Sequence, residues 1–224
     1  MVRRTAATAA ALLAVVLAAA CDTPAGEPGA SPSVTTAPEA ASTLPGLPAP
    51  EAAREALEGL TVADPRPMTG YSRDHFPHWT TEDGCTVRET VLRRDGTDVE
   101  VDDDCRPATG RWHSPYEDAD YTDPSDIDID HVVPLANAWR SGADAWTEEE
   151  REAFANDLTR PQLIAVGNRI NREKGDQSPD QWQPPEREFW CTYALAWVAV
   201  KDAYGLTVTG PERAELEDML GTCG

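Results

Sequence analysis

The sequence predicts an α+β domain in which a β-hairpin and a strand–loop–strand–helix unit are stapled by disulfides and flanked by helices. Three observations lead to this fold class. Short β-branched runs alternate with segments of helical composition. Four cysteines lie in residues 85–223, and low-complexity sequence separates them from an export signal at the start of the chain. We therefore expect one globular domain over residues 51–224.

The first 20 residues have the composition of a signal peptide. Two arginines lie in residues 1–4, residues 5–20 are an uncharged run rich in Ala, Leu and Val, and Cys21 follows three alanines. The run is shorter than the roughly 20 apolar residues of a membrane-spanning helix. Residues 1–20 are therefore expected to direct export and to be removed.

Cys21 stands where the signal peptide would be cut, and this placement resembles a bacterial lipobox, in which the cysteine is lipidated. A lipobox has its leucine three residues before the cysteine, whereas here Leu17 lies four before it and Ala18 takes that place. We expect lipidation and a cell-surface lipoprotein. The alternative is cleavage near Ala20 and plain secretion.

The segment that follows is made mainly of Pro, Ala, Ser, Thr and Gly. Such sequence cannot bury enough apolar surface to offset its ordering entropy, so residues 21–50 are expected to form a disordered tether. Residues 51–60 have the composition of a short amphipathic helix that would open the domain.

With Cys21 set aside, four cysteines remain in the exported part of the chain, and this even number predicts two disulfides. Three connectivities are open, and we favour the local one because each bridge then closes a modest loop. A zinc site is the alternative, but the sequence contains no CxxC pair. The favoured bridges are Cys85–Cys105 and Cys191–Cys223.

Local patterns predict the remaining elements. Residues 86–92 alternate β-branched and polar side chains, and residues 98–101 follow an Asp-Gly turn signal, so together they predict a β-hairpin. Thr147 and Glu150 have capping-box spacing, and Gly175 would close a helix. Further strands are expected at 126–135, ended by Pro134, and at 163–166, and helices at 146–156, 168–174 and 186–204.

The formal net charge of −21 at pH 7 opposes a protein that coats nucleic acid by bulk electrostatics. Part of the acidic excess lies in runs at 102–104 and 148–150. An enzyme that must release its product can still act on phosphate groups through local cations and a metal. Modest, salt-sensitive substrate affinity would follow.

Two motifs lie in the strand–loop–strand–helix unit. Residues 130–134 read DHVVP, the DHxxP pattern, and residues 171–174 read NREK, the NxxK pattern. Together they resemble the signature of His-Asn-His (HNH) nucleases. More broadly, the chain resembles a secreted HNH family related to the C-terminal nuclease domain of GmrSD-type restriction enzymes, over most of residues 70–223. The resemblance implies a ββα-metal finger that hydrolyses phosphodiester bonds.

The resemblance also implies roles for individual residues. His131 would be the general base that activates water, and Asp130 a metal ligand, in a loop that lets both face the metal. Asn171 would take the second ligand position, in place of the family's third histidine, because no histidine follows His131. This oxygen pair suits one Mg²⁺ or Mn²⁺ ion better than Zn²⁺.

Four neighbouring residues receive supporting roles. Asn168, Asn171 and Lys174 share one helix face by their spacing, which would bring Lys174 to a substrate phosphate. We assign Arg172 to substrate binding as well. Asn168 either orients the adjacent loop or caps the helix. Gln162 stands at the family's middle position, whose amide braces the loop that bears the histidine.

Other polar residues leave alternatives open. We expect loop or surface positions for three histidines, and either phosphate contacts or ion pairs for three arginines. These residues are His75, His78 and His113, and Arg73, Arg88 and Arg111.

The expected function is that of a monomeric, exported endonuclease of low sequence specificity that cuts DNA, with RNA left open. It would meet a membrane only through its lipid anchor. Alternating aspartates at 126, 128 and 130 suggest a calcium-binding surface protein instead, but His131 and Asn137 replace the Gly and Glu of an EF-hand loop. An inert HNH-like binding module would require the base or a ligand to be missing.

Overall fold

The computed structural model describes residues 44–224. The expected signal peptide, Cys21 and the tether up to residue 43 lie outside the described residues. Residues 44–50 were expected in the tether but belong to the fold, because Leu44 is buried in the main core. Gly46, at φ +69°, passes so close to the Thr159 carbonyl that a Cβ atom would lie 2.8 Å from it. No helix within residues 44–224 is long and apolar enough to cross a membrane.

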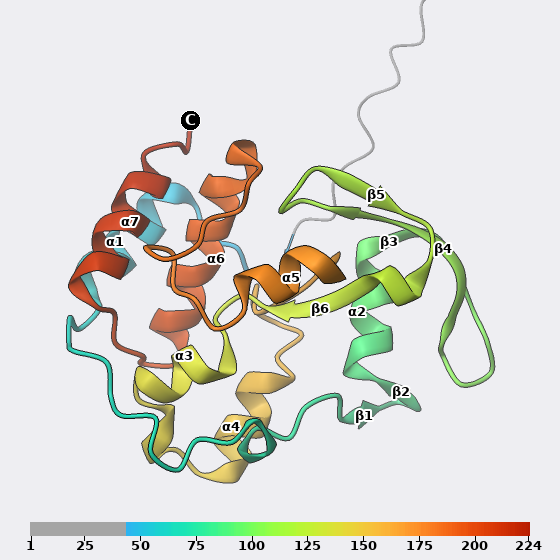
Figure 1. The fold of residues 1–224 in the computed structure, drawn as a ribbon, viewed down its shortest axis with the longest axis horizontal. Helices are drawn as coiled ribbons and strands as arrows, with labels where there is room; N and C mark the ends of the chain where they lie inside the picture. The colour runs from blue at the N-terminus through green and yellow to red at the C-terminus, as the bar shows by residue number, and fades with distance from the viewer. Residues whose placement is uncertain (1–43) are drawn as a thin grey trace, which may run out of the picture. The chain divides into compact units, whose positions relative to one another are not determined.

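Three helices gather on one side of the fold (Figure 1). Helix α1 (Pro50–Gly59) was predicted, and α6 (Trp190–Ala203) begins four residues later than expected, after the 3-10 turn η4 (Arg187–Phe189). The sequence did not predict α7 (Gly210–Leu220), whose first turn is fixed by a Thr209–Glu212 capping box. The predicted Cys191–Cys223 bridge joins the start of α6 to the chain after α7.

The predicted hairpin over 86–92 and 98–101 was wrong. Residues Val87–Asp95 form helix α2, because Val87, Val91 and Leu92 lie on one helical face and pack under a sheet. The sheet pairs β3 (Gly96–Val101) with β4 (Pro107–Ser114), and β4 with β5 (Ala119–Tyr121), all antiparallel. Strands β1 (Thr81–Glu82) and β2 (Cys85–Thr86), of two residues each, form a short hairpin, and the predicted Cys85–Cys105 bridge joins this hairpin to the β3–β4 loop.

The centre of the domain has the strand–strand–helix order that the sequence predicts. Strand β6 (Ile127–His131) pairs antiparallel with β7 (Leu163–Gly167), and α5 (Asn168–Lys174) follows β7 directly. Between the strands lie α3 (Leu135–Arg140), η3 (Ala143–Ala145) and α4 (Glu148–Ala155), the last with the expected Thr147 capping box. Figure 1 shows β6 and α5 between the helical side and the β3–β4–β5 sheet.

Strand β6 separates two hydrophobic clusters. Ile127 and Ile129 belong to the smaller cluster with α2 and Trp112, whereas Val132, just beyond the strand, belongs to the main core. Successive side chains of a strand point to opposite faces. The end of β6 therefore lies where the two clusters meet. The elements of the structure confirm the predicted α+β class, and both predicted disulfides are present.

Candidate functional site

An open hollow lies at the end of β6, beside α5. It brings together three residues assigned to catalysis from the sequence, Asp130, His131 and Asn171. The loop expected at Asp130 and His131 is not present, because β6 remains paired with β7 through His131, which lies opposite Leu163. The full lining is Arg73, Ile129, Asp130, His131, Pro134, Leu135, Asn171, Gly175 and Asp176.

Asp130 is held from two directions by buried partners. The Lys174 ammonium lies 3.0 Å from Oδ1 and 2.8 Å from Oδ2, and the Tyr116 hydroxyl donates to Oδ2 at 2.7 Å. Lys174 also donates to the His131 carbonyl at 2.9 Å. Burial raises the pKa of Asp130, and the adjacent Lys174 opposes that rise.

Lys174 is not placed to make the substrate contact that its helix spacing suggested. Its side chain is fully buried, so its ammonium faces the strand instead of solvent. Burial lowers the pKa of Lys174, while the Asp130 carboxylate opposes the shift. The residue is therefore a counter-charge for Asp130 and a link from α5 to β6.

His131 leaves the strand on the face opposite Asp130. Its Nε2 lies 2.9 Å from the Ala155 carbonyl at the end of α4, and its ring centroid lies 5.4 Å from that of Trp79. Burial lowers the pKa of His131 to about 3, although the bond to Ala155 raises it. The ring is therefore neutral near pH 7, the form that can accept a proton.

Gln162 makes backbone contacts of the kind expected of the middle position. Its side-chain amide accepts from the Val133 N–H at 3.1 Å and donates to the Val133 carbonyl at 2.9 Å. Its own carbonyl accepts from the Val132 N–H at 2.8 Å. These bonds fix the chain directly after His131, where it leaves β6.

The α5 residues are placed differently from one another. The Asn171 amide lines the hollow and donates to the Asp128 carboxylate at 3.2 Å. Asn168 does not cap the helix, because Gly167 occupies the cap position, and its amide instead donates to the Ser125 carbonyl at 3.3 Å. Arg172 is exposed and does not line the hollow.

Sequence reasoning did not place residues 71–80 as a wall of the site, and it left Arg73 open between a phosphate contact and an ion pair. Arg73 lines the hollow, and the rings of His78 and Trp79 lie beside that of His131. Trp79 has φ 62°, a left-handed conformation that is costly for a bulky residue. The only signal in the sequence was an aromatic, turn-rich composition, which does not indicate where the segment docks.

The donor set of the hollow fits a hard cation such as Mg²⁺. Asp130 Oδ1 accepts one hydrogen bond, from Lys174, and so keeps a free lone pair. The Asn171 carbonyl oxygen supplies a second hard donor, and Mg²⁺ commonly keeps several waters beside one or two protein ligands. Within residues 44–224 no three His, Cys, Asp or Glu side chains converge as a cluster that could hold a metal ion, so the candidate ligands are Asp130 and Asn171 alone.

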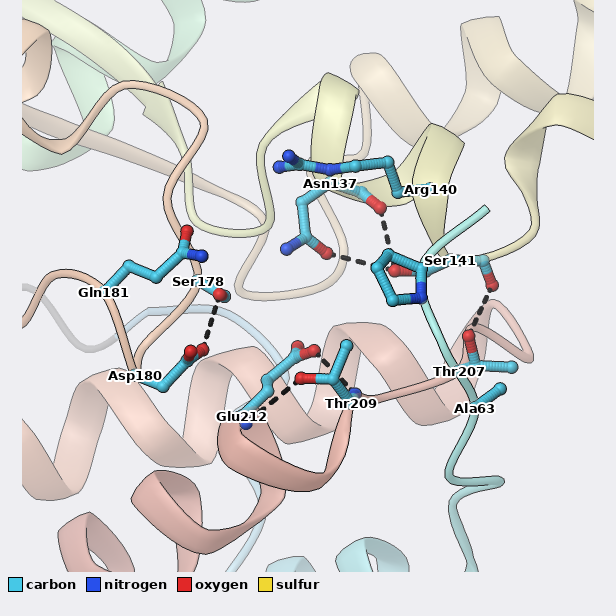
Figure 2. A pocket seen from close by; sticks show the side chains of 11 residues that line it. Ala63, Asn137, Arg140, Ser141, Ser178, Asp180, Gln181, Thr207, Thr209 and Glu212 are labelled. Atoms are coloured by element: carbon cyan, nitrogen blue, oxygen red, sulfur yellow. Dashed lines mark hydrogen bonds between the residues drawn. The ribbon is translucent and has the colours of Figure 1, made fainter. Parts of the chain in front are cut away.

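A second hollow, between α3, α7 and the loop after α5, is lined mainly by polar side chains (Figure 2). Behind it lies the fully buried Lys201, whose ammonium donates to Asn137 Oδ1 and Ser141 Oγ at 2.7 Å and pairs with Glu212 at 2.9 Å. These charges are already partnered, so they serve to join α3, α6 and α7.

Comparisons with known proteins cover most of the residues that line the first hollow. The family model described as "GmrSD restriction endonucleases, C-terminal domain" matches residues 91–219, which include Asp130, His131, Gln162 and Asn171 but not Arg73. An "Uncharacterized secreted protein" of Arthroderma benhamiae is 53% identical over 192 residues, covering 85% of this chain and 94% of that protein. No solved structure matches.

Proposed function

The chain belongs to the family of the C-terminal domain of GmrSD restriction endonucleases, and from this premise we propose that it is a metal-dependent endonuclease of the HNH type. The observation that carries the proposal is that Asp130, His131 and Asn171 all line one open hollow, with Asp130 and His131 on opposite faces of β6. These are the base and the two oxygen ligands that phosphodiester hydrolysis of this type requires.

His131 acts as the general base through Nδ1. A carbonyl can only accept, so Nε2 must carry the proton that it donates to Ala155. The neutral ring then has its lone pair on Nδ1, where it can take a proton from water. The same bond fixes the ring plane, so the base is oriented before substrate arrives.

Asp130 and Asn171 would hold the divalent cation, with Mg²⁺ the best match to their oxygens and Mn²⁺ the next. When bound, the cation acidifies water and neutralises charge on the phosphate. Lys174 and Tyr116 hold the Asp130 carboxylate in place by hydrogen bonds to Oδ1 and Oδ2.

The proposed substrate is DNA, cut with low sequence specificity. Residues 44–224 form the domain that carries the hollow, and no separate recognition module remains within them. The formal net charge of −21 supports modest affinity, since few cations are available to contact phosphates. Whether the protein also cleaves RNA is tested by the parallel reactions described next.

Incubation of the protein with supercoiled plasmid and Mg²⁺ is expected to give nicked and linear DNA, visible by gel electrophoresis, and EDTA should stop the reaction. Mn²⁺ should restore cleavage after EDTA is removed, and Zn²⁺ should restore it less well. Parallel reactions with single-stranded DNA and RNA define the substrate range. Plasmid that stays intact with both Mg²⁺ and Mn²⁺ would count against the proposal.

We also propose that the enzyme is exported and held at the cell surface by lipid on Cys21. The sequence pattern of residues 1–21 supports both parts of this proposal, and the name "secreted protein" given to the relative supports export alone. Two acyl chains give stable anchoring where one is marginal. The wild-type protein should partition with membranes, and Cys21→Ala should release it with unchanged specific activity. A lipid-free N-terminus in the medium, read by mass spectrometry, would instead establish plain secretion.

A further inference from the structure

Arg73 is the cationic side chain that the hollow offers to an incoming phosphate. Among the residues of its lining it carries the sole positive charge, since Lys174 is buried behind Asp130. Arg73 itself is exposed, so a substrate can reach it. Phosphodiester substrates are anionic, and the other charged groups lining the hollow, Asp130 and Asp176, are acidic.

A neighbouring histidine orients the Arg73 side chain. The Arg73 Nε–H points at His78 Nε2, 3.4 Å away. His78 Nδ1 lies 2.8 Å from the Phe76 carbonyl and must therefore carry the proton, which leaves Nε2 as an acceptor. The bond engages only Nε, so the two terminal nitrogens keep the paired N–H groups that suit phosphate oxygens.

The turn that holds His131 also holds this wall. Asn156 follows Ala155, and its side chain accepts from the Thr80 N–H at 3.1 Å and donates to the Pro77 carbonyl at 2.8 Å. The two bonds clamp the chain on both sides of His78 and Trp79. The proposed base and the Arg73–His78 pair are thus fixed to the same end of α4.

Three other arginines, which the sequence or the structure places near the domain surface, have different engagements. Arg88 donates to the Ile127 carbonyl, Arg140 to the Asp176 carbonyl, and Arg111 pairs with Asp98 at 2.8 Å. None of these three lines the first hollow. Arg111 therefore provides a matched control, with the same charge at a site away from the hollow.

We propose that the Arg73 guanidinium, oriented by His78, binds a phosphate of the nucleic acid strand beside the scissile bond. This inference rests on the proposed nuclease function and adds a substrate-binding residue that lies outside the DHxxP and NxxK motifs. Arg73 touches the substrate, whereas His78 acts through Arg73 as a positioning residue.

Arg73→Gln is expected to lower kcat/KM for plasmid cleavage by about 10- to 100-fold, the range for losing a hydrogen bond to a charged group. Arg111→Gln, with the same change in net charge, should leave it within about twofold. Arg73→Lys keeps the charge but not the fork and should fall between. If the wild-type enzyme cleaves and Arg73→Gln matches Arg111→Gln, the inference is overturned while the nuclease function stands.

A binding measurement tests the phosphate contact without cleavage. In a His131→Ala background with EDTA, fluorescence anisotropy of a labelled duplex gives the slope of log K against log salt. Losing one phosphate contact should reduce the magnitude of that slope by about 0.9 for Arg73→Gln, with no change for Arg73→Lys. An unchanged slope for Arg73→Gln would contradict the inference, whether or not the wild-type protein cuts DNA.

The positioning role of His78 is tested by non-additivity. His78→Phe keeps an aromatic ring beside Trp79 but removes the acceptor for Arg73. It should lower kcat/KM by a smaller factor than Arg73→Gln, and the double variant should be no worse than Arg73→Gln alone. Independent, multiplying losses would show that His78 acts by another route.

Discussion

Replacement of His131 by alanine is expected to lower kcat for DNA cleavage by about 10²- to 10⁴-fold, the usual contribution of a general base. The ring that would take the proton is lost, while Asp130 and Asn171 remain to hold the cation. KM and the affinity for Mg²⁺ should change little, because His131 is not one of the proposed metal ligands. Steady-state cleavage and Mg²⁺ titration measure the two effects separately.

The fold should survive this substitution. The Ala155 carbonyl loses its partner, and an unsatisfied buried acceptor costs about 1–3 kcal/mol. Circular dichroism and thermal melting therefore belong beside the kinetics. His113→Ala is the matched control, since His113 lies in β4, half exposed, and contacts Asp120 on the surface. Near wild-type cleavage by His131→Ala would refute the assignment of the base.

Elements with strong local signals were predicted well from the sequence. The start of α4 follows from the Thr147 capping box, and α5 ends before Gly175, at φ +53°, as its glycine indicates. Strands β6 and β7 follow from their apolar patterns. The order of these elements, and hence the meeting of Asp130 with Asn171, could therefore be inferred from the chain alone.

The misassigned helix α2 shows a conflict between two local signals. Residues 86–92 alternate as a strand does, but Thr86 and Glu89 also form a capping box, and the apolar spacing of Val87 and Val91 is helical. Packing decides between the two readings, because the helical face fits the smaller cluster under β4 and β7. The same capping signal, at Thr209 and Glu212, marks the unpredicted α7.

The wall that carries Arg73 could not be found by such reasoning. It contacts His131 and Asn156 across more than fifty residues of sequence, and nothing local to residues 71–80 encodes that pairing. The substrate contact expected of Lys174 was misplaced for a related reason. Helical spacing told us that it shares a face with Asn171, but not that this face packs on β6 and buries the ammonium.

Replacement of Lys174 by methionine is expected to destabilise the domain by about 3–5 kcal/mol, because removing one member of a buried ion pair strands the other. Methionine keeps most of the volume, so the loss comes from the charge. Asp130 would remain buried with only the Tyr116 hydroxyl as a partner, and the His131 carbonyl would lose its donor. Urea unfolding followed by tryptophan fluorescence gives the free energy of unfolding directly.

Two further variants decide whether the buried pair is the cause of the loss. Arg169→Gln breaks the exposed Arg169–Glu173 pair on the same helix and should cost at most about 1 kcal/mol. Asp130→Asn combined with Lys174→Met removes both charges, so it should be more stable than Lys174→Met alone. If Lys174→Met unfolds at the wild-type urea concentration and instead loses DNA affinity, the ammonium reaches substrate after all, and the role first expected from its helix spacing would be restored.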